Sequence, residues 1–312
     1  MTSTRKQKLI LIDTFNFLFR AYYALPKTLT DSDGNPTNAV YGVTSMLLTV
    51  FDALKPDYVI AALESKSPIE RSDHFEDYKA NRKPMDEDLK VQIPSVFEVL
   101  DAFGITSISV DGFEADDVIG TAVESFADNP NLDIIIVSND RDLWQLLRDN
   151  VMIMIPNNKN GLADWVGVNE VKAKYGFSPK QMIEYKSLRG DPSDNIPGVK
   201  GIGEKTALSL IDTYGSLNGI YENIESVTPE SVKQKLIVDK DNAYMSHKLA
   251  TIVTNVPIGV SLSECGYTEF SKGAVVEVMR KYNFKSLIRR LGFDPNTGKE
   301  KIVVSENQLG LF

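Results

Sequence analysis

Acidic residues stand at the ends of short apolar segments in the first half of this sequence. Five of them end or closely follow four such segments: Asp13, Glu64, Glu114, Asp140 and Asp142. If the segments are parallel β-strands, their carboxyl ends meet at one edge of a sheet, which is where open α/β sheets bind ligands. We therefore expect these carboxylates to converge.

Four further acids extend the set. Asp116 and Asp117 adjoin Glu114, and a spacing of three places Glu114 and Asp117 on one face of a helix. Asp191 and Asp194 repeat this spacing in a loop rich in Gly, Pro and Asn. Crowded carboxylates repel one another and are costly to desolvate, so they need cations. For any single acid, capping of a helix is the simpler alternative.

The donor atoms of this set predict its chemistry. Nine carboxylates with no histidine or cysteine among them favour Mg²⁺ or Mn²⁺ over Zn²⁺. Because Mg²⁺ keeps several waters and engages phosphates, the set predicts hydrolysis of a phosphodiester with the help of two metal ions. The sequence offers no Ser/His/Asp or Cys/His arrangement for a covalent alternative.

The elements that must position these acids follow from hydrophobic patterning. Apolar, β-branched runs typical of buried parallel strands span residues 8–13, 58–63, 106–110, 133–138 and 151–155. Amphipathic stretches include residues 39–54, 93–103 and 116–127. This alternation predicts an α/β fold with a parallel sheet. From about Ser178 onward, helical patterns with glycine punctuation replace the strands. We expect an α/β core over residues 1–180, a helical region over 181–292 and a flexible tail over 293–312.

The composition is ordinary for a globular protein, with 43 acidic and 34 basic residues and a net charge of −9. Setting aside the nine candidate ligands leaves equal numbers of acids and bases, so the charge does not exclude a nucleic-acid partner. A single cysteine, Cys265, excludes an internal disulfide framework and fits the reducing cytoplasm. The apolar run near the N-terminus is too short for a signal peptide or a membrane span. We expect a cytoplasmic monomer without membrane attachment.

The segment over about residues 65–94 is polar and interleaves basic with aromatic residues. Arg71, Phe75, Tyr78, Lys79 and Arg82 recur at helical spacing, which would place them on one face of a helix. Such a face suits single-stranded nucleic acid, because bases stack on rings while cations meet phosphates. The alternative is a solvated, salt-bridged helix face.

A glycine-rich stretch follows in the helical region. Gly198, Gly201 and Gly203 precede a predicted helix without a strand before them, which is wrong for a dinucleotide-binding loop. A tight turn that presents backbone N–H groups to a phosphate fits better. A purely structural helix cap is the alternative.

Six segments together resemble the motif series of the bacterial 5′ to 3′ exonucleases and flap endonucleases, a family that includes the N-terminal nuclease domain of bacterial DNA polymerase I. They are residues 11–22, 37–42, 78–82, 112–117, 138–143 and 190–207. The resemblance runs in order from about residue 8 to 292. It implies a structure-specific nuclease of replication and repair that acts on branched or nicked DNA with a 5′ end.

The likeness also implies roles for single residues. Eight of the nine acids, all but Glu64, match metal-ligand positions of the family. The segment around residues 65–94 would form an arch over the active site, in which Lys79 and Arg82 steady the scissile phosphate, and Arg20 matches another phosphate-facing position. The glycine-rich stretch would be a helix–turn–helix-like clamp on duplex DNA, often with bound K⁺, in which Lys200 and Lys205 contact phosphates.

Two departures from the family pattern stand out. Glu64 replaces an aspartate at the end of the second strand, which puts the metal position in question. Arg141 replaces a lysine between Asp140 and Asp142, and we expect it to face away from them. A DNA-binding protein with impaired catalysis therefore stays open as a rival, as does an RNA-directed nuclease on the same scaffold.

The last five residues end the chain in large apolar side chains. They resemble the Gln-Leu-x-Leu-Phe peptide that binds the bacterial β sliding clamp. The likeness implies hydrogen bonds from Gln308 and an apolar pocket filled by Leu309, Leu311 and Phe312. The alternatives are a tail that packs on its own domain or a chance match.

Overall fold

The computed structural model describes residues 5–65, 67, 69–71, 75–156, 163–267 and 269–300. These residues form two compact units, each built from several stretches of chain. The first unit takes in the residues up to 16 together with 54–85 and 106–266, and the second takes in 17–53, 86–105 and the residues from 267 onward.

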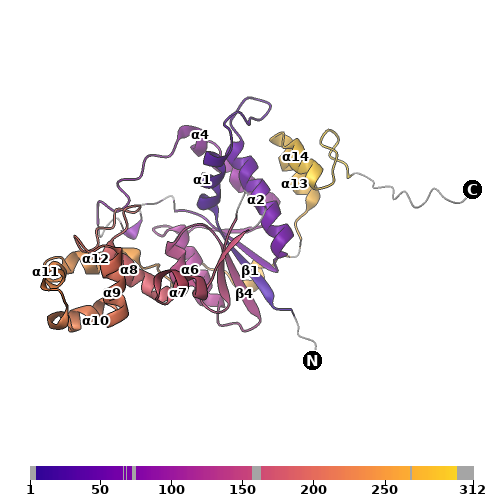
Figure 1. Cartoon of the computed structure of the whole chain (residues 1–312). Coiled ribbons are helices and arrows are strands. Elements are labelled where there is room, and N and C mark those ends of the chain that lie inside the picture. Colours follow the sequence, from indigo (N-terminus) through magenta and orange to yellow (C-terminus); the bar gives the residue numbers. More distant parts are fainter. Residues whose placement is uncertain are drawn as a thin grey trace, which may run out of the picture. The chain divides into compact units, whose positions relative to one another are not determined.

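A six-stranded sheet is the centre of the first unit. Its strands are β1 (Gln7–Asp13), β2 (Tyr58–Ala62), β3 (Thr106–Ile108), β4 (Leu132–Val137), β5 (Val151–Ile155) and β6 (Asp164–Val166). Their order is β3-β2-β1-β4-β5-β6, and all are parallel except β6, which pairs antiparallel with β5. Figure 1 shows β1 and β4 side by side in the middle of the sheet. The predicted α/β class and the five predicted strands are confirmed. The short edge strand β6 was not predicted.

The two central strands are buried because both of their faces are covered. Leu9 and Ile10 in β1 and Ile134 and Ile136 in β4 are each 0% exposed. Such continuous β-branched and leucine runs are typical of parallel strands. Helix α6 belongs to the same core through Val118, Ile119 and Ala122 among others. Since the parallel strands end at one edge, the residues that follow them are brought to that edge.

The remaining helices of the first unit follow the sheet strands or form the helical region. They are α6 (Ala115–Phe126), η1 (Asp142–Leu146), α7 (Val168–Tyr175), η2 (Pro179–Gln181), α8 (Met182–Arg189), α9 (Glu204–Tyr214), α10 (Leu217–Glu222), η3 (Ile224–Ser226), α11 (Glu230–Val238), α12 (Lys240–Ala250) and η4 (Leu262–Cys265). Helices α8 to α12 lie together in Figure 1, with colours that run from red-pink at α8 to orange at α12. These helices agree with the helical part of the predicted fold class, whereas the residues from 267 onward belong to the second unit.

The second unit is helical in its described residues. It contains most of α1 (Thr14–Ala24) and α2 (Asn38–Leu54), with α4 (Glu87–Lys90), α5 (Ile93–Ala102), α13 (Lys272–Lys281) and α14 (Lys285–Arg290). Gln92 joins α2 to α5, because its side-chain oxygen accepts the N–H of Ala39 at 2.9 Å. Among the described helices, none has the length and apolar character needed to cross a bilayer.

The segment expected to form a helical arch differs from the prediction. Residues 75–85 contain no helix, and residues 76–81 form turns. Lys79 has a φ of +57°, which a right-handed helix cannot accommodate. The shared helical face predicted for Arg71 through Arg82 is therefore not formed in the described residues.

Candidate active site

Asp13 ends β1 at the sheet edge and is held by two hydrogen bonds. Its Oδ2 accepts the hydroxyl of Ser138 at 2.8 Å, and its Oδ1 accepts the N–H of Asn16 at 3.1 Å. Burial raises the pKa of the Asp13 carboxyl to about 6, although these hydrogen bonds oppose the rise. The carboxylate is thus oriented by the strand ends but is not neutralised by a cation.

Three more acids have carboxyl groups whose pKa is raised by burial. Burial raises the pKa of Glu64 to about 7, and repulsion from Glu114 and Asp13 adds to the rise. Burial, and then the charges of Asp140 and Asp13, raise the pKa of Asp116 well above its usual value. Burial likewise raises the pKa of Asp140. Within the described residues of the first unit, no lysine or arginine forms an ion pair with any of these four acids. We call Asp13, Glu64, Asp116 and Asp140 the open carboxylates.

The other five predicted ligands are paired with cations, and two of them share Arg71. The guanidinium of Arg71 donates to Glu114 Oε2 at 2.7 Å and to both oxygens of Asp117 at 2.7 and 2.8 Å. Asp117 also accepts the N–H groups of Val253 at 2.8 Å and Glu114 at 3.1 Å. Arg71 donates further to the carbonyl of Thr251 at 2.8 Å. Arg71 and Asp117 are therefore buried together in a network with satisfied hydrogen bonds.

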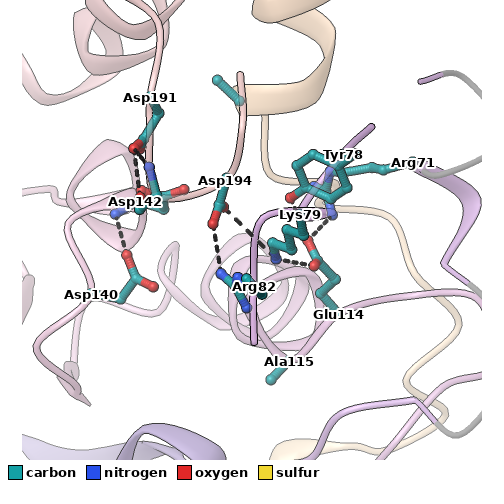
Figure 2. A network of polar contacts seen from close by, with 12 residues as sticks. Arg71, Tyr78, Lys79, Arg82, Glu114, Ala115, Asp140, Asp142, Asp191 and Asp194 are labelled. Carbon is teal, nitrogen blue, oxygen red and sulfur yellow. Dashed lines mark hydrogen bonds and ion pairs between the residues drawn. The ribbon is translucent and has the colours of Figure 1, made fainter. Parts of the chain in front are cut away.

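Lys79 and Arg82 bind the acids as well. Arg82 donates to Asp194 Oδ1 at 2.6 Å, and Lys79 pairs with Glu114 and lies 3.8 Å from Asp194 Oδ2. Figure 2 shows both cations directed toward these carboxylates, with Tyr78 beside Glu114. Tyr78 is buried, and its hydroxyl donates to Glu114 at 3.1 Å. Phe75 packs against the same small cluster, so neither ring is presented as an open stacking surface.

Backbone and amide contacts fix this segment to the loop that carries Asp194. The N–H of Lys79 donates to the carbonyl of Asp194 at 3.0 Å. Asn195 donates from its side chain to the carbonyl of Asp77 at 2.7 Å, and Asn81 donates to that of Pro192 at 2.6 Å. The two asparagines were missed in the sequence because side-chain amides are common in turns and carry no spacing signal.

Lys186 holds the last two predicted ligands, Asp142 and Asp191. Its ammonium contacts Asp142 and lies 2.6 Å from Asp191 Oδ2. Burial favours the neutral acid, but Lys186 and Ser193 hold the pKa of Asp191 below its usual value. Lys186 was not predicted, although it lies five residues before Asp191 on α8. A cleft of about 500 Å³ opens beside it, lined by Asp140 among others.

The glycine-rich stretch forms the predicted tight turn before α9. Gly198 has a φ of +63°, and its N–H donates to the hydroxyl of Ser246 at 2.9 Å. A Cβ at this position would lie 2.2 Å from the backbone nitrogen of Gly190. Lys200 and Lys205 are exposed at this turn, as are Gly201 and Gly203. The turn therefore depends on close contact between the backbones of Gly198 and Gly190. The side chains of Lys200 and Lys205 are exposed to solvent beside it.

The nine candidate carboxylates are chemically suited to a divalent metal ion. Their positions in the structure, however, do not form a complete coordination site. Among the described residues, no three Asp, Glu, His or Cys side chains converge closely enough to hold one ion as they stand. All candidate donors are carboxylate oxygens, and four of them form no ion pair within the part of the first unit that the structure describes. Since Mg²⁺ uses few carboxylates and several waters, this set suits Mg²⁺ or Mn²⁺.

Comparison with known protein families accounts for most of the chain. A model of the 5′-3′ exonuclease N-terminal resolvase-like domain matches residues 8–176, and a model of the 5′-3′ exonuclease C-terminal SAM fold matches residues 177–273. The chain belongs to the 5′-3′ exonuclease family. The resemblance inferred from the motifs is thereby confirmed.

Members of this family with similar sequence include two bacterial DNA polymerases I. That of Caldicellulosiruptor bescii is 46% identical over 287 residues, covering 91% of this chain and 33% of the polymerase. That of Bacillus subtilis is 38% identical over 293 residues, covering 93% and 33%. The chain therefore spans about a third of the length of these relatives.

Solved structures of exonucleases share the fold. Bacteriophage T5 5′-exonuclease with divalent metal ions (zinc) bound superposes with a TM-score of 0.63 at 20% identity, covering 88% of this chain and 93% of that one. A T5 flap endonuclease in complex with DNA and metal ions gives 0.65 at 18% identity, covering 89% and 100%. At these identities the likeness shows the fold.

The two departures from the exonuclease pattern have distinct settings. Glu64 is half-buried, and its Oε2 accepts the N–H of Ala115 at 3.5 Å. Arg141 is exposed and lies 5.8 Å from the ring centre of Trp144, which agrees with its predicted orientation. Arg20 lies half-buried on α1 in the second unit, and burial lowers the pKa of its guanidinium. The tail peptide, Gln308 to Phe312, lies outside the described residues.

Proposed function

We propose that this chain is a structure-specific 5′ to 3′ exonuclease and flap endonuclease, which hydrolyses DNA phosphodiesters with Mg²⁺ or Mn²⁺ in the cytoplasm during replication and repair. The observation that carries the proposal is the group of open carboxylates at the strand ends. Four acids whose pKa values are raised by burial, and which form no ion pair within the described residues of the first unit, are costly to maintain unless they serve a ligand.

The residues of the chain divide the catalytic work. Asp13, Asp116 and Asp140, with Glu64, would hold metal first. Bound ions would supply Lewis-acid charge to the phosphodiester and lower the pKa of a water. Lys79 and Arg82 would turn from Glu114 and Asp194 to the scissile phosphate and place positive charge where negative charge develops. Addition of water across the bond between phosphorus and the 3′ oxygen gives a 5′-phosphate and a 3′-hydroxyl.

The substrate we propose is branched or nicked DNA with a 5′ end. The exposed Lys200 and Lys205 at the turn before α9 support a duplex contact, because lysines beside a helix N-terminus suit phosphates. A K⁺ ion at this turn belongs to the same proposal.

A labelled 5′-flap substrate tests the function directly. We expect cleavage with Mg²⁺ or Mn²⁺ and none with EDTA, and a flap made of RNA separates the RNA-directed alternative. Asp116→Ala should abolish cleavage while duplex binding persists, since affinity depends on basic contacts. Asp111→Ala changes an exposed aspartate nearby and should cleave like the wild type. Full activity of Asp116→Ala would refute the metal assignment.

We also propose that the C-terminal peptide, Gln308 to Phe312, binds the bacterial β sliding clamp. The support is its sequence, Gln-Leu-Gly-Leu-Phe, which places one polar side chain beside three large apolar ones. Such a tether would raise the local concentration of nuclease at DNA junctions. Deletion of residues 308–312 should abolish clamp binding in a pull-down and leave cleavage of a free flap unchanged. Clamp binding that survives the deletion would contradict the proposal.

A further inference from the structure

The nine predicted ligands fall into two groups that differ in their counter-charge. The open carboxylates have no ion pair within the described residues of the first unit, whereas Asp142 and Asp191 are bridged by Lys186. The bridging lysine is deeply placed, since its side chain is 8% exposed and those of Asp142 and Asp191 are 17% and 15% exposed. A single ammonium thus stands between two carboxylates where the family resemblance expects a metal.

Lys186 cannot be exchanged for a metal ion without a penalty. Lys186 lies on α8, a helix that packs against α9 and α12. Because its side chain is buried, water does not screen its charge. Displacing a buried cation from its partners leaves an uncompensated charge, which is strongly unfavourable. The open carboxylates form no ion pair within the described residues of the first unit, so a cation that binds them displaces no such partner and relieves their mutual repulsion.

We propose that Lys186 acts as a built-in counter-ion that occupies the place of a divalent cation between Asp142 and Asp191. The chain then binds divalent metal in two classes. The strong class lies at the open carboxylates, and the weak class at Asp142 and Asp191 fills only when Lys186 is displaced. This inference rests on the proposed function for the identity of the ligand as a divalent cation, but not for DNA cleavage.

The cleft beside Lys186 supplies a matched control. Lys174 lines the same cleft, but its ammonium lies 5.3 Å from the ring centres of Trp144 and of Tyr175 and not on a carboxylate. Lys174→Met and Lys186→Met therefore remove the same charge from the same cleft. They differ in whether a carboxylate pair loses its counter-ion.

The test is a Mn²⁺ titration of the full chain, with free Mn²⁺ followed by electron paramagnetic resonance. We expect a strong and a weak class in the wild type. Lys186→Met should tighten the weak class by about tenfold or more, because a direct opposite charge shifts ionic equilibria by that order. Lys186→Gln should do the same and keeps a donor for both carboxylates, so it decides the matter if the Met variant does not fold. Lys174→Met should change the affinity by less than about threefold.

Three results would overturn the proposal: identical Mn²⁺ sites in the wild type, a weak class that Lys186→Gln leaves unchanged or weakens, or an equal gain from Lys174→Met. A flap assay on the same samples separates this inference from the proposed function. If Mn²⁺ binding shifts as expected but no DNA is cleaved, the nuclease proposal fails and the counter-ion stands. If cleavage is normal but the weak class does not respond, the counter-ion fails alone.

Discussion

Asp116 and Asp117 are neighbours in α6 with opposite electrostatic surroundings. Asp117 is 1% exposed, and its oxygens accept from Arg71 and from two backbone N–H groups. Asp116 faces the repelling charges of Asp140 and Asp13. The resemblance to the family predicts both as metal ligands, but in the structure Asp117 serves as a hydrogen-bonded anchor for Arg71.

This contrast predicts opposite effects of the same substitution. Asp117→Asn should lower the free energy of unfolding by about 3–5 kcal/mol, because it leaves the buried Arg71 with half of its counter-charge. Asp116→Asn should leave stability unchanged or raise it, because it removes a repelled carboxylate. Urea denaturation in EDTA measures both, and EDTA keeps metal binding out of the comparison. Equal losses from the two variants would contradict the division of roles.

At the scale of elements, the glycine-rich turn depends on one close approach. Gly198 has a left-handed backbone and lies against Gly190, whereas Gly203 has a φ of −94° and open space at its Cβ position. Alanine at Gly203 therefore causes neither backbone strain nor a clash, and it loses only the modest preference of an N-cap for glycine over alanine. The two glycines are equivalent in the sequence pattern but not in the fold.

Gly198→Ala should therefore destabilise the chain by more than about 3 kcal/mol, since the new Cβ must displace backbone and the φ is unfavourable. Gly203→Ala should cost less than about 1 kcal/mol. Thermal or urea unfolding of the two variants gives the comparison. A loss for Gly203→Ala as large as that for Gly198→Ala would mean that the turn is not held by this approach.

The elements also show which parts of the secondary structure could be predicted from the sequence. The strand from 151 to 155 was predicted to the residue, because a β-branched run buried in a parallel sheet has a strong local signal. The arch was predicted from the resemblance to the family, and the spacing of its residues placed them on one face if the segment is helical. Its conformation is set by contacts to Asp194, Asn195 and Glu114, which are distant in sequence. Local periodicity carries no information about such partners.

The same limit applies to the site. The acids at strand ends were found because the parallel topology fixes where strand termini meet. Their division into open and paired groups depends on Arg71, Lys79, Arg82 and Lys186, which reach the acids from other segments. Types and spacing of residues therefore identified the candidate acids, but not which cation each one binds.

At the scale of the whole molecule, the proposed function requires an acidic chain to bind an acidic polymer. With a net charge of −9, long-range attraction cannot come from total charge, so affinity has to depend on where the lysines and arginines are placed. Several of them are engaged with the acids of the site, including Lys79, Arg82 and Lys186. Lys200 and Lys205 are exposed at the turn before α9 and are the cations that we expect to meet the duplex.

Lys200→Ala combined with Lys205→Ala should weaken binding to nicked duplex DNA and lower the slope of log affinity against log salt by roughly two, because each lost phosphate contact releases about one counter-ion fewer. Fluorescence anisotropy in EDTA at several KCl concentrations measures the slope without cleavage. Lys272→Ala combined with Lys285→Ala removes two exposed lysines from the second unit and gives the same net charge. If position governs binding, this control keeps the wild-type slope. If both pairs lower the slope equally, total charge governs DNA binding and the duplex contact lies elsewhere.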